Sequence, residues 1–531
     1  MKRMNHQIRI NFLDRADECG NSHLRLRQLS VVCILSPALL FGIISVKAGS
    51  ATWSTNPVSS EWNLAANWMP NTVPNGPGDT ATFGSSNTVD LSLTGSIETN
   101  RIVFNSGASA FTVSSDPAGT FSSLRVTGLG ITNNSGTAQN FVALTDAAGG
   151  QGTILFTNSA SAGTLTTFIN QANPVAGIDG GLTDFVDKSS AGSGIFVNEG
   201  ATVSGGSPGR SDLFEHATGA EATFINHGGA VEGGPGGITQ FLVSASAGTA
   251  TLIADGGSNG GGGGQIVFWD SSGGGSARLE LFGNGFLNLA PHNGAVNVGS
   301  IEGDGFVQLW GHTLSVGSNN VSTAFSGVIE EGSSQTSGGA ITKIGIGSLT
   351  LTGPNTFTGT TNVAAGTLIV SNGAGSGTGT GAVKINAGTL GGKGIIAGAT
   401  TIGTGSGGGA FLAPAVGSNK QAMLTIQSAL TFNSDATYTC TFKAKKNKAR
   451  SDLVVANGVT INGATLNLVG QTQGSLKTGL TLTLISNTSA NPISGTFSNL
   501  PDGGTVTING NNFQASYEGG DGNDLTLTVV P

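Results

Sequence analysis

Short apolar segments recur along the middle of the chain at nearly constant spacing. In each repeat, one apolar segment ends near a phenylalanine and a second apolar segment follows it. The phenylalanines recur about every 28 residues and are Phe156, Phe185, Phe214, Phe241 and Phe268. A repeat of two short strands cannot bury its apolar side alone, so the copies must stack. The pattern predicts a solenoid with these phenylalanine rings lying above one another in its core.

The composition supports strands rather than helices. Glycine accounts for 88 of the 531 residues, and only 10% of the residues are charged. Glycine and the frequent threonine, serine and asparagine residues oppose helix formation. Apolar residues still make up 37% of the chain and return in β-branched and phenylalanine-containing segments, unlike those of a disordered linker. We predict an all-β fold, a parallel β-helix in which each rung is one repeat and rungs lie about 4.8 Å apart.

Polar residues keep the same period. Asn170, Asn198 and Asn226 occupy equivalent positions in three successive repeats, which predicts an amide ladder at a turn. Ser-Ala-Gly sequences at 161–163, 190–192 and 246–248 separate the two strands of a repeat. Further along, the segment that begins at Val363 returns at Ile385, after a shorter interval. The rungs are therefore expected to become more compact in this part of the chain.

These patterns divide the chain into five parts. We predict a signal peptide at 1–48, an N-terminal cap with the first rungs at 49–150, the longer rungs at 151–300, compact rungs at 301–410 and a C-terminal β cap at 411–531. Trp53, Trp62 and Trp68 lie close together in the second part. We expect them to plug the open end of the solenoid, with a sugar-stacking platform as the alternative.

The N-terminal residues have the pattern of an export signal. Arg25 and Arg27 precede an apolar run from 29 to 46, and Val46 and Ala48 fit a small-residue cleavage site. Retention as a membrane anchor is the alternative. Residues 49–531 carry 15 basic and 27 acidic residues, a net charge of −12, and one cysteine, Cys440. This balance argues against nucleic acid as a partner, and we expect no disulfide and no further membrane span.

A longer motif resembles a known family. Residues 341–361 read Ile-Thr-Lys-Ile-Gly-Ile-Gly-Ser-Leu-Thr-Leu-Thr-Gly-Pro-Asn-Thr-Phe-Thr-Gly-Thr-Thr and run into Ala365-Gly366-Thr367-Leu368. This segment resembles the autotransporter-associated β-strand repeat. Residues 62–83 look like the N-terminal cap common in such proteins, and residues 438–466 and 493–497 are similar to final passenger coils. The resemblance implies a passenger-type, single-stranded, right-handed parallel β-helix with caps at both ends, outside a Gram-negative cell.

The resemblance carries no catalytic residues. The sequence reaches Pro531 without the alternating strands of a membrane barrel. We therefore expect a secreted protein, or one attached noncovalently to the outer-membrane surface. A component of the cell envelope is then an expected partner.

Several short motifs suggest chemistry that a turn explains equally well. Gly519–Asp524 resembles a single calcium-binding RTX nonapeptide, which normally needs tandem copies, so we predict a hairpin turn and leave calcium binding open. Gly205-Gly206-Ser207-Pro208-Gly209 satisfies the G-x-S-x-G nucleophile pattern but lacks a following helix. The glycine run at 403–409 lacks the helix and lysine of a phosphate loop.

An enzyme on the same fold would need clustered acids. Gly311-His312-Thr313 is the nearest approach to the Gly-His-Gly sequence of polygalacturonase-like sites. The acidic residues Asp179, Asp184, Asp187, Glu330 and Glu331 show no arginine or lysine partner in evident phase. The histidines His6, His23, His216, His227, His292 and His312 show no metal-ligand spacing. We predict no catalytic, cofactor-binding or metal-binding residue.

One basic cluster stands out from the acidic chain. It contains Lys443, Lys445, Lys446, Lys448 and Arg450, between two predicted strands. A solvated loop is one interpretation; an anchor for anionic envelope lipid or polysaccharide is the other. The sequence favours an adhesive or structural surface protein that binds polysaccharide, matrix or neighbouring cells through a repetitive flank. The alternative is a polysaccharide-active hydrolase or lyase.

Overall fold

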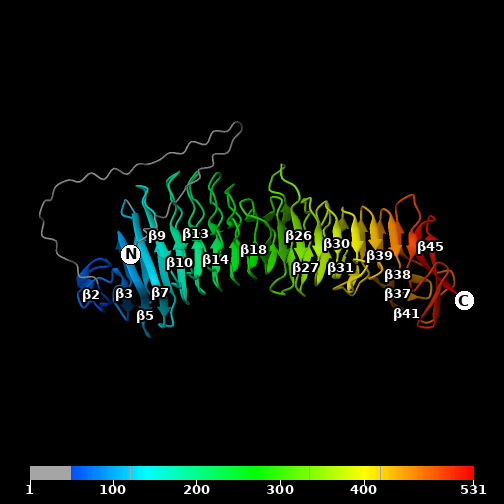
Figure 1. The fold of residues 1–531 in the computed structure, drawn as a ribbon, viewed down its shortest axis with the longest axis horizontal. Coiled ribbons are helices and arrows are strands. Elements are labelled where there is room, and N and C mark those ends of the chain that lie inside the picture. The colour runs from blue at the N-terminus through cyan, green and yellow to red at the C-terminus, as the bar shows by residue number, and fades with distance from the viewer. Residues whose placement is uncertain (1–48, 120, 334, 419) are drawn as a thin grey trace, which may run out of the picture. The chain divides into compact units, whose positions relative to one another are not determined.

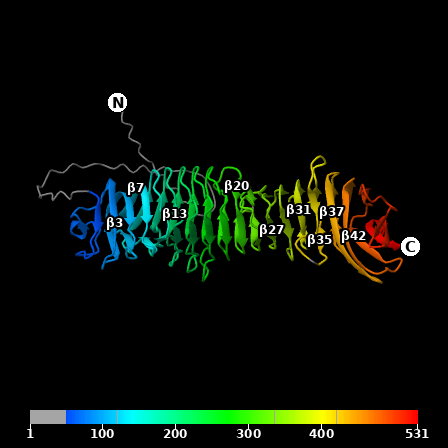
Figure 2. The same ribbon diagram turned by 90° about the horizontal axis from the view of Figure 1, so that it is seen from below.

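The computed structural model describes residues 49–531 except 120, 334 and 419. The predicted signal peptide, residues 1–48, lies outside these described residues. The described residues belong to one compact unit. Its described part consists of short strands, with one 3-10 turn at Ala65–Asn67. The strands follow one another along a single axis in chain order (Figures 1 and 2). The predicted all-β, parallel β-helical architecture is confirmed.

The first sheet covers the N-terminal part of the solenoid. Apart from the antiparallel edge strand β2, its neighbours pair in parallel. In spatial order it contains β2 (Trp68–Met69), β1 (Ala51–Trp53), β3 (Gly76–Phe83), β5 (Ser96–Phe104), β7 (Phe121–Asn133), β9 (Gln151–Phe156), β11 (Leu182–Phe185), β13 (Arg210–Leu213), β15 (Ile238–Phe241), β17 (Gln265–Phe268), β19 (Phe286–Asn288), β22 (Phe306–Gln308) and β25 (Val328–Glu330).

The second sheet runs through almost every rung. Its parallel ladder contains β4 (Asp90–Thr94), β6 (Thr112–Asp116), β8 (Gln139–Ala143), β10 (Thr166–Asn170), β12 (Ile195–Asn198), β14 (Thr223–Asn226), β16 (Thr251–Ala254), β18 (Arg278–Leu281), β21 (Ser300–Gly303), β24 (Thr323–Phe325), β27 (Ser348–Leu351), β29 (Thr367–Val370), β31 (Gly388–Gly392), β34 (Ala410–Leu412), β37 (Ala436–Lys445) and β41 (Thr465–Gln473). β38 (Lys448–Ser451) folds back antiparallel to β37.

Two further sheets occupy the C-terminal half. The third is parallel and contains β20 (Val296–Val298), β23 (Thr313–Val316), β26 (Ala340–Lys343), β28 (Thr361–Val363), β30 (Val383–Ile385), β33 (Thr400–Ile402), β36 (Leu430–Phe432), β40 (Val459–Asn462) and β43 (Ser494–Thr496). The fourth contains β32 (Ile395–Ile396), β35 (Met423–Ile426), β39 (Leu453–Ala456), β42 (Thr481–Asn487), β46 (Asp524–Val530), β45 (Asn511–Gly519) and β44 (Thr505–Ile508). Its last pairings are antiparallel, as a closing cap requires.

The register confirms both predicted kinds of repeat. In the longer rungs, Phe168 pairs with Phe196 and Phe196 with Phe224. In the compact rungs, Val363 pairs with Ile385. The predicted Ser-Ala-Gly turns also stack, because single-residue bridges join Ser161, Ser190, Thr218, Ser246 and Gly273 in sequence. These bridges form a narrow third side of the coil before the third sheet begins.

The predicted phenylalanine ladder is confirmed except at Phe214. Phe156 stacks on Phe185 with ring centroids 4.8 Å apart, and Phe241 stacks on Phe268 at 5.0 Å. Between these pairs, the buried position belongs to Leu213, which pairs with both Phe185 and Phe241. Phe214 lies one residue past β13 and is only half-buried. Because successive side chains of a strand point to opposite faces, a shift of one residue removes Phe214 from the core.

A second aromatic ladder faces the first across the core. Its members stack at centroid distances of 4.7 to 5.0 Å and are Phe141, Phe168, Phe196 and Phe224. The two ladders meet edge to face, with Phe185 and Phe196 at 5.4 Å and 77°. Offset and edge-to-face ring pairs of this kind contribute about 0.5–1.5 kcal/mol beyond the area they bury.

The predicted asparagine ladder lies inside the coil. Asn170 Nδ2 donates to Asn198 Oδ1, and Asn198 Nδ2 donates to Asn226 Oδ1, each at 2.8 Å. A parallel column of hydroxyls supports it, since Thr183 donates to Asn170 and Ser211 donates to Asn198. All these side chains are fully buried. The amides therefore satisfy one another along the axis, as buried polar groups must.

Both ends of the coil are closed. Trp53, Trp62 and Trp68 are at most 2% exposed and surround Phe83 at the N-terminal end. The plug interpretation is confirmed, because these buried rings leave no open face for a sugar. At the other end, Tyr438 and Phe497 are buried, with ring centroids 6.2 Å apart, and antiparallel strands of the fourth sheet cover the last rungs.

Candidate functional sites

Four basic side chains lie on one outward face of the hairpin formed by β37 and β38. The antiparallel register pairs Lys443 with Arg450 and Lys445 with Lys448. On its other side β37 pairs with β41, which adds a glutamine to each row. We call the resulting surface the basic face. Its two rows, all of exposed residues, are Arg450–Lys443–Gln471 and Lys448–Lys445–Gln473.

The inward side of this hairpin is fixed by packing. Phe442 and Ala444 alternate with the lysines along β37 and are buried. The Phe442 ring meets Phe513 of the C-terminal cap at 5.5 Å and 71°. Where the hairpin returns to the coil, Asp452 accepts hydrogen bonds from the backbone N–H and hydroxyl of Thr441 at 2.8 and 2.9 Å. The basic face is therefore held by a buried inner side and by hydrogen bonds at its base.

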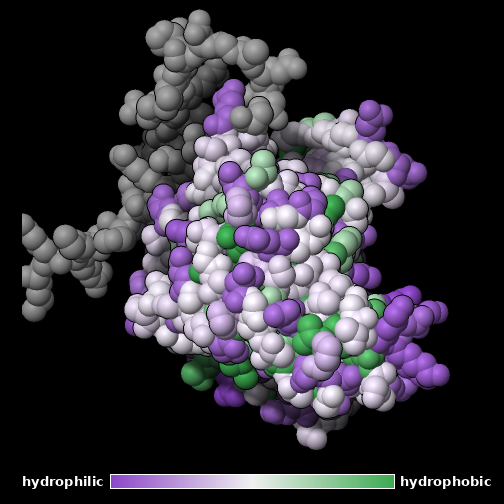
Figure 3. Space-filling model, turned by 90° about the vertical axis from the view of Figure 1, so that its right-hand side faces the viewer, coloured by the Kyte–Doolittle hydropathy of each residue, from purple (hydrophilic) through white to green (hydrophobic). Residues whose placement is uncertain are grey.

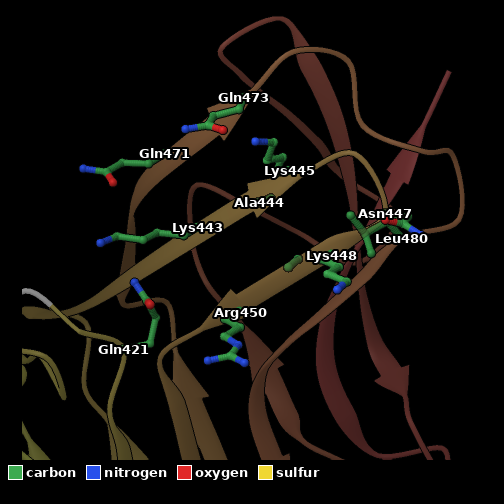
Figure 4. Close-up of a pocket in the computed structure, with 11 residues that line it drawn as sticks. Gln421, Lys443, Ala444, Lys445, Asn447, Lys448, Arg450, Gln471, Gln473 and Leu480 are labelled. Carbon is green, nitrogen blue, oxygen red and sulfur yellow. The ribbon is translucent and has the colours of Figure 1, made fainter.

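A cavity of about 670 Å³ opens on the basic face (Figure 4). Its polar lining includes Gln421, Asn447 and the two rows, and its apolar lining is limited to Ala444, Ala449 and Leu480. Lys443 and Gln471 extend side by side into the open space (Figure 4). Hydrophilic side chains gather at one edge of this end of the molecule (Figure 3). Among the residues that the structure describes, no ion pair joins Lys445, Lys448 or Arg450 to a carboxylate.

The two-residue turn at the tip carries a further basic residue. Lys446 has a φ of +51°, in the left-handed region that normally favours glycine. Lys477 also approaches the tip, because its backbone N–H donates to the Lys446 carbonyl at 2.8 Å. The predicted basic cluster is thus brought together by the fold as a strand face with a charged tip.

A second charged cluster lies on the outer face of the first sheet. Asp184 and Asp212 are register partners on adjacent rungs, and Arg210 Nε lies 2.8 Å from Asp212 Oδ2. The Asp212 side chain is only 5% exposed. Burial, followed by the charge of Asp212, raises the pKa of Asp184 well above its usual range. Burial also raises the pKa of Asp212, although the Arg210 guanidinium opposes this change.

The expectation that these acids lack a basic partner was wrong for Asp184, because the Arg210 guanidinium lies near enough to act on its carboxyl group. Asp212, which the sequence did not single out, completes the cluster. The two aspartates are separated by one repeat length, and this spacing was the signal that could have paired them. Asp184 and Glu330 share one outward column, but six rungs separate them. At about 4.8 Å a rung they lie roughly 29 Å apart.

Glu330 and Glu331 line a smaller cavity of about 450 Å³. Glu331 accepts hydrogen bonds from the Thr358 hydroxyl at 2.7 Å and from the backbone N–H groups of Thr358, Gly339 and Gly311. Burial opposes ionisation of Glu331, but these bonds outweigh it and lower the pKa. Through these hydrogen bonds, Glu331 connects three segments of backbone.

Near this cavity, the ring of His312 meets that of His292 edge to face, with ring centroids 6.2 Å apart. Burial together with the His292 charge lowers the pKa of His312.

The remaining motifs occupy turns. Gly209 of the G-x-S-x-G sequence precedes β13, where an added Cβ would lie 1.9 Å from the Asn170 carbonyl oxygen, so packing requires this glycine. Gly519 pairs with Asp524 at the end of the β45–β46 hairpin, which confirms the predicted hairpin turn. There the Asp524 carboxylate accepts the backbone N–H of Asn487 at 2.9 Å. Calcium binding at this turn stays an open question.

No cluster of three or more histidine, cysteine or acidic side chains suited to a metal ion occurs in the described part of the chain. Cys440 is buried in β37, and burial raises the pKa of its thiol to about 12. Among residues 49–119, 121–333, 335–418 and 420–531, the structure contains no helix with the length and apolar character needed to cross a bilayer.

The segment that carries the family resemblance lies within the continuous ladders. It contributes β26 and β28 to the third sheet and β27 and β29 to the second. Residues 341–370 match the family model of the passenger-associated-transport-repeat. The repeat and the parallel strands together are consistent with an autotransporter passenger-type repeat protein, as the resemblance implied. None of the curated proteins matches the chain.

Proposed function

We propose that this protein is a secreted or cell-surface scaffold that acts as an adhesive or structural element. Its flank would contact polysaccharide, matrix or neighbouring cells. The passenger-type repeat at 341–370 supports this proposal most directly, because passenger proteins function outside the cell that makes them. The second-sheet ladder runs through this repeat without interruption, so one continuous coil joins the repeat to both caps.

The outer surface of the second sheet is suited to distributed contacts. Thr167, Ile195, Thr223 and Thr251 form one outward column over successive rungs. Beside it, Ile169, Val197, Ile225 and Ile253 form a second outward column. Repetition of the same side chains about every 4.8 Å presents many equivalent weak sites. Such a surface gains strength through multivalent contact with a repetitive ligand.

Two measurements test the location and the adhesive role. Protease treatment of intact cells should degrade the protein if it is exposed on the surface, and the culture medium should contain it if it is released. A glycan and matrix array probed with the purified protein should show binding without release of reducing sugar. An intact protein confined to the cell interior would refute the proposal.

A polysaccharide-active enzyme is the second candidate, and the Asp184–Asp212 pair supports it. Asp184, whose pKa is raised well above its usual range, would be the acid of glycoside hydrolysis, and Asp212, whose Oδ2 lies 2.8 Å from Arg210 Nε, would be the ionised partner. Reducing-sugar release that disappears in Asp212→Asn, while array binding persists, would favour this candidate. Equal background release from the wild type and the variant would count against it.

A further inference from the structure

We propose that the basic face is a binding site for acidic polysaccharide, with the two cationic rows engaging carboxylate or phosphate groups along the polymer. The inference rests on the proposed extracellular role and adds a ligand class and a location to it. It concerns one end of the coil, whereas the adhesive flank concerns its length.

The basic face carries an energetically unfavourable arrangement of charges. Lys445 lies directly opposite Lys448 in an antiparallel pair, and like charges in such pairs destabilise a sheet. Within the described residues, neither lysine has a carboxylate partner in an ion pair. Folding alone does not explain why like charges are placed opposite one another. A bound polyanion would relieve this repulsion.

The basic face also differs in charge from the rest of the molecule. Residues 49–531 carry a net charge of −12, so most of the surface repels a polyanion. The hairpin from Lys443 to Arg450 contains five basic residues and no acidic one. An acidic polymer would therefore be attracted to this end of the coil and excluded from the flank.

Neutral polar side chains complete the site. Gln471 and Gln473 complete the two rows, and Gln421 and Asn447 line the same cavity. Each amide offers both donors and an acceptor, which suits the hydroxyl groups between the charges of a polysaccharide. The cavity volume of about 670 Å³ lies in the usual range for ligand pockets, about 300–1,000 Å³.

The same lining argues against a lipid surface. Binding to a bilayer normally combines basic residues with large apolar side chains that enter the acyl region. The apolar lining here consists of Ala444, Ala449 and Leu480, and none of them is exposed. A polymer with charges and hydroxyls therefore fits the chemistry of this face better than a membrane does.

The test compares two variants of the full chain that lose the same number of charges. In the site variant, the four basic residues of the two rows become glutamine, and in the control variant four exposed basic residues elsewhere do so. The site substitutions are Lys443→Gln, Lys445→Gln, Lys448→Gln and Arg450→Gln. The control substitutions are Arg125→Gln, Lys188→Gln, Lys384→Gln and Lys393→Gln.

Binding is measured with polygalacturonate, with neutral dextran, and with vesicles containing phosphatidylglycerol and phosphatidylcholine in a 3:7 ratio. Wild type and control should bind polygalacturonate, and the site variant should bind at least tenfold more weakly. The dependence of log K on log salt should become shallower by about 3, at about 0.7 for each lost contact with a flexible polyanion. Binding of the neutral dextran should not differ among the three proteins.

Equal weakening in both variants would overturn the proposal, because net charge would then explain binding. Binding to vesicles but not to polygalacturonate would assign the face to lipid instead. If the quadruple site variant unfolds, the double variant Lys448→Gln/Arg450→Gln should still weaken polymer binding by at least threefold. These assays use purified protein, so a failure here is distinct from failure of the surface-location test.

Discussion

Phe185 is the register partner of Leu213 and not of the adjacent Phe214. Leu213 is completely buried between Phe185 and Phe241, whereas Phe214 is half-buried outside the strand. Leu213→Ala should therefore lower the free energy of unfolding by about 2–5 kcal/mol, because it leaves a cavity in the core. Phe214→Ala should cost less than half as much, although it removes a larger side chain. Urea denaturation of both variants measures the difference, and equal losses would contradict this register.

The same pair of residues shows what the sequence predicts well. The long repeat period locates the rungs, because every stacked element must recur with it. It does not distinguish Leu213 from Phe214, because both are apolar and adjacent. The choice depends on which face of β13 turns inward, and that is set by the pairing with β11 and β15.

The basic face and the acidic pair differ in how visible they are in the sequence. Lys443, Lys445 and Lys448 stand out because they are close together in an acidic chain. Asp184 and Asp212 are far apart in sequence and meet only because their spacing equals one rung. The contribution of Gln471 and Gln473 depends on the pairing of β37 with β41, which composition does not reveal.

The asparagine ladder should be sensitive to a single deletion. Asn198 is completely buried, donates to Asn226 and Thr239, and accepts from Asn170 and Ser211. Asn198→Ala leaves these groups without one partner in the core, and each unsatisfied group costs about 1–3 kcal/mol. We expect a loss of about 2 kcal/mol or more in the free energy of unfolding. The exposed Asn386→Ala is the control, and similar denaturation midpoints for the two variants would refute a structural role of the ladder.

The Asp184–Asp212 pair predicts a particular dependence on pH. The folded-state pKa of Asp184 is raised, so the unfolded chain releases this proton first as the pH rises. Protonation of Asp184 therefore stabilises the folded chain at acidic pH. This contribution is lost as the pH increases above the ordinary aspartate pKa. Asp184→Asn keeps the shape without the charge and should increase stability at pH 8 relative to wild type, with a smaller gain at pH 4. Chemical denaturation at both pH values measures this, with the exposed Glu221→Gln as control. A gain that does not change with pH would exclude the mechanism.

Lys343 gives the passenger-type repeat a titratable group in its core. The side chain is 1% exposed, and its ammonium donates to the carbonyls of Ile344 and, at 2.9 Å, Gly345. Lys343→Met keeps the apolar stem but leaves these carbonyls without their donor, which should cost about 1–3 kcal/mol near pH 7. Burial lowers the pKa of Lys343 from 10.5 to about 8. Between these values the unfolded chain binds more protons than the folded chain, so the stability of the wild type should rise as the pH increases from 8 to 10.5.

The stability of the Lys343→Met variant should not rise with pH in this way, because methionine does not titrate. Urea midpoints of the wild type and the variant at pH 8.0, 9.0 and 10.0 would therefore separate progressively. Lys393→Gln, at an exposed position of the compact rungs, should instead parallel the wild type over this range. Parallel curves for Lys343→Met and the wild type would mean that the ammonium keeps an ordinary pKa, with the two carbonyl hydrogen bonds balancing the cost of burying it.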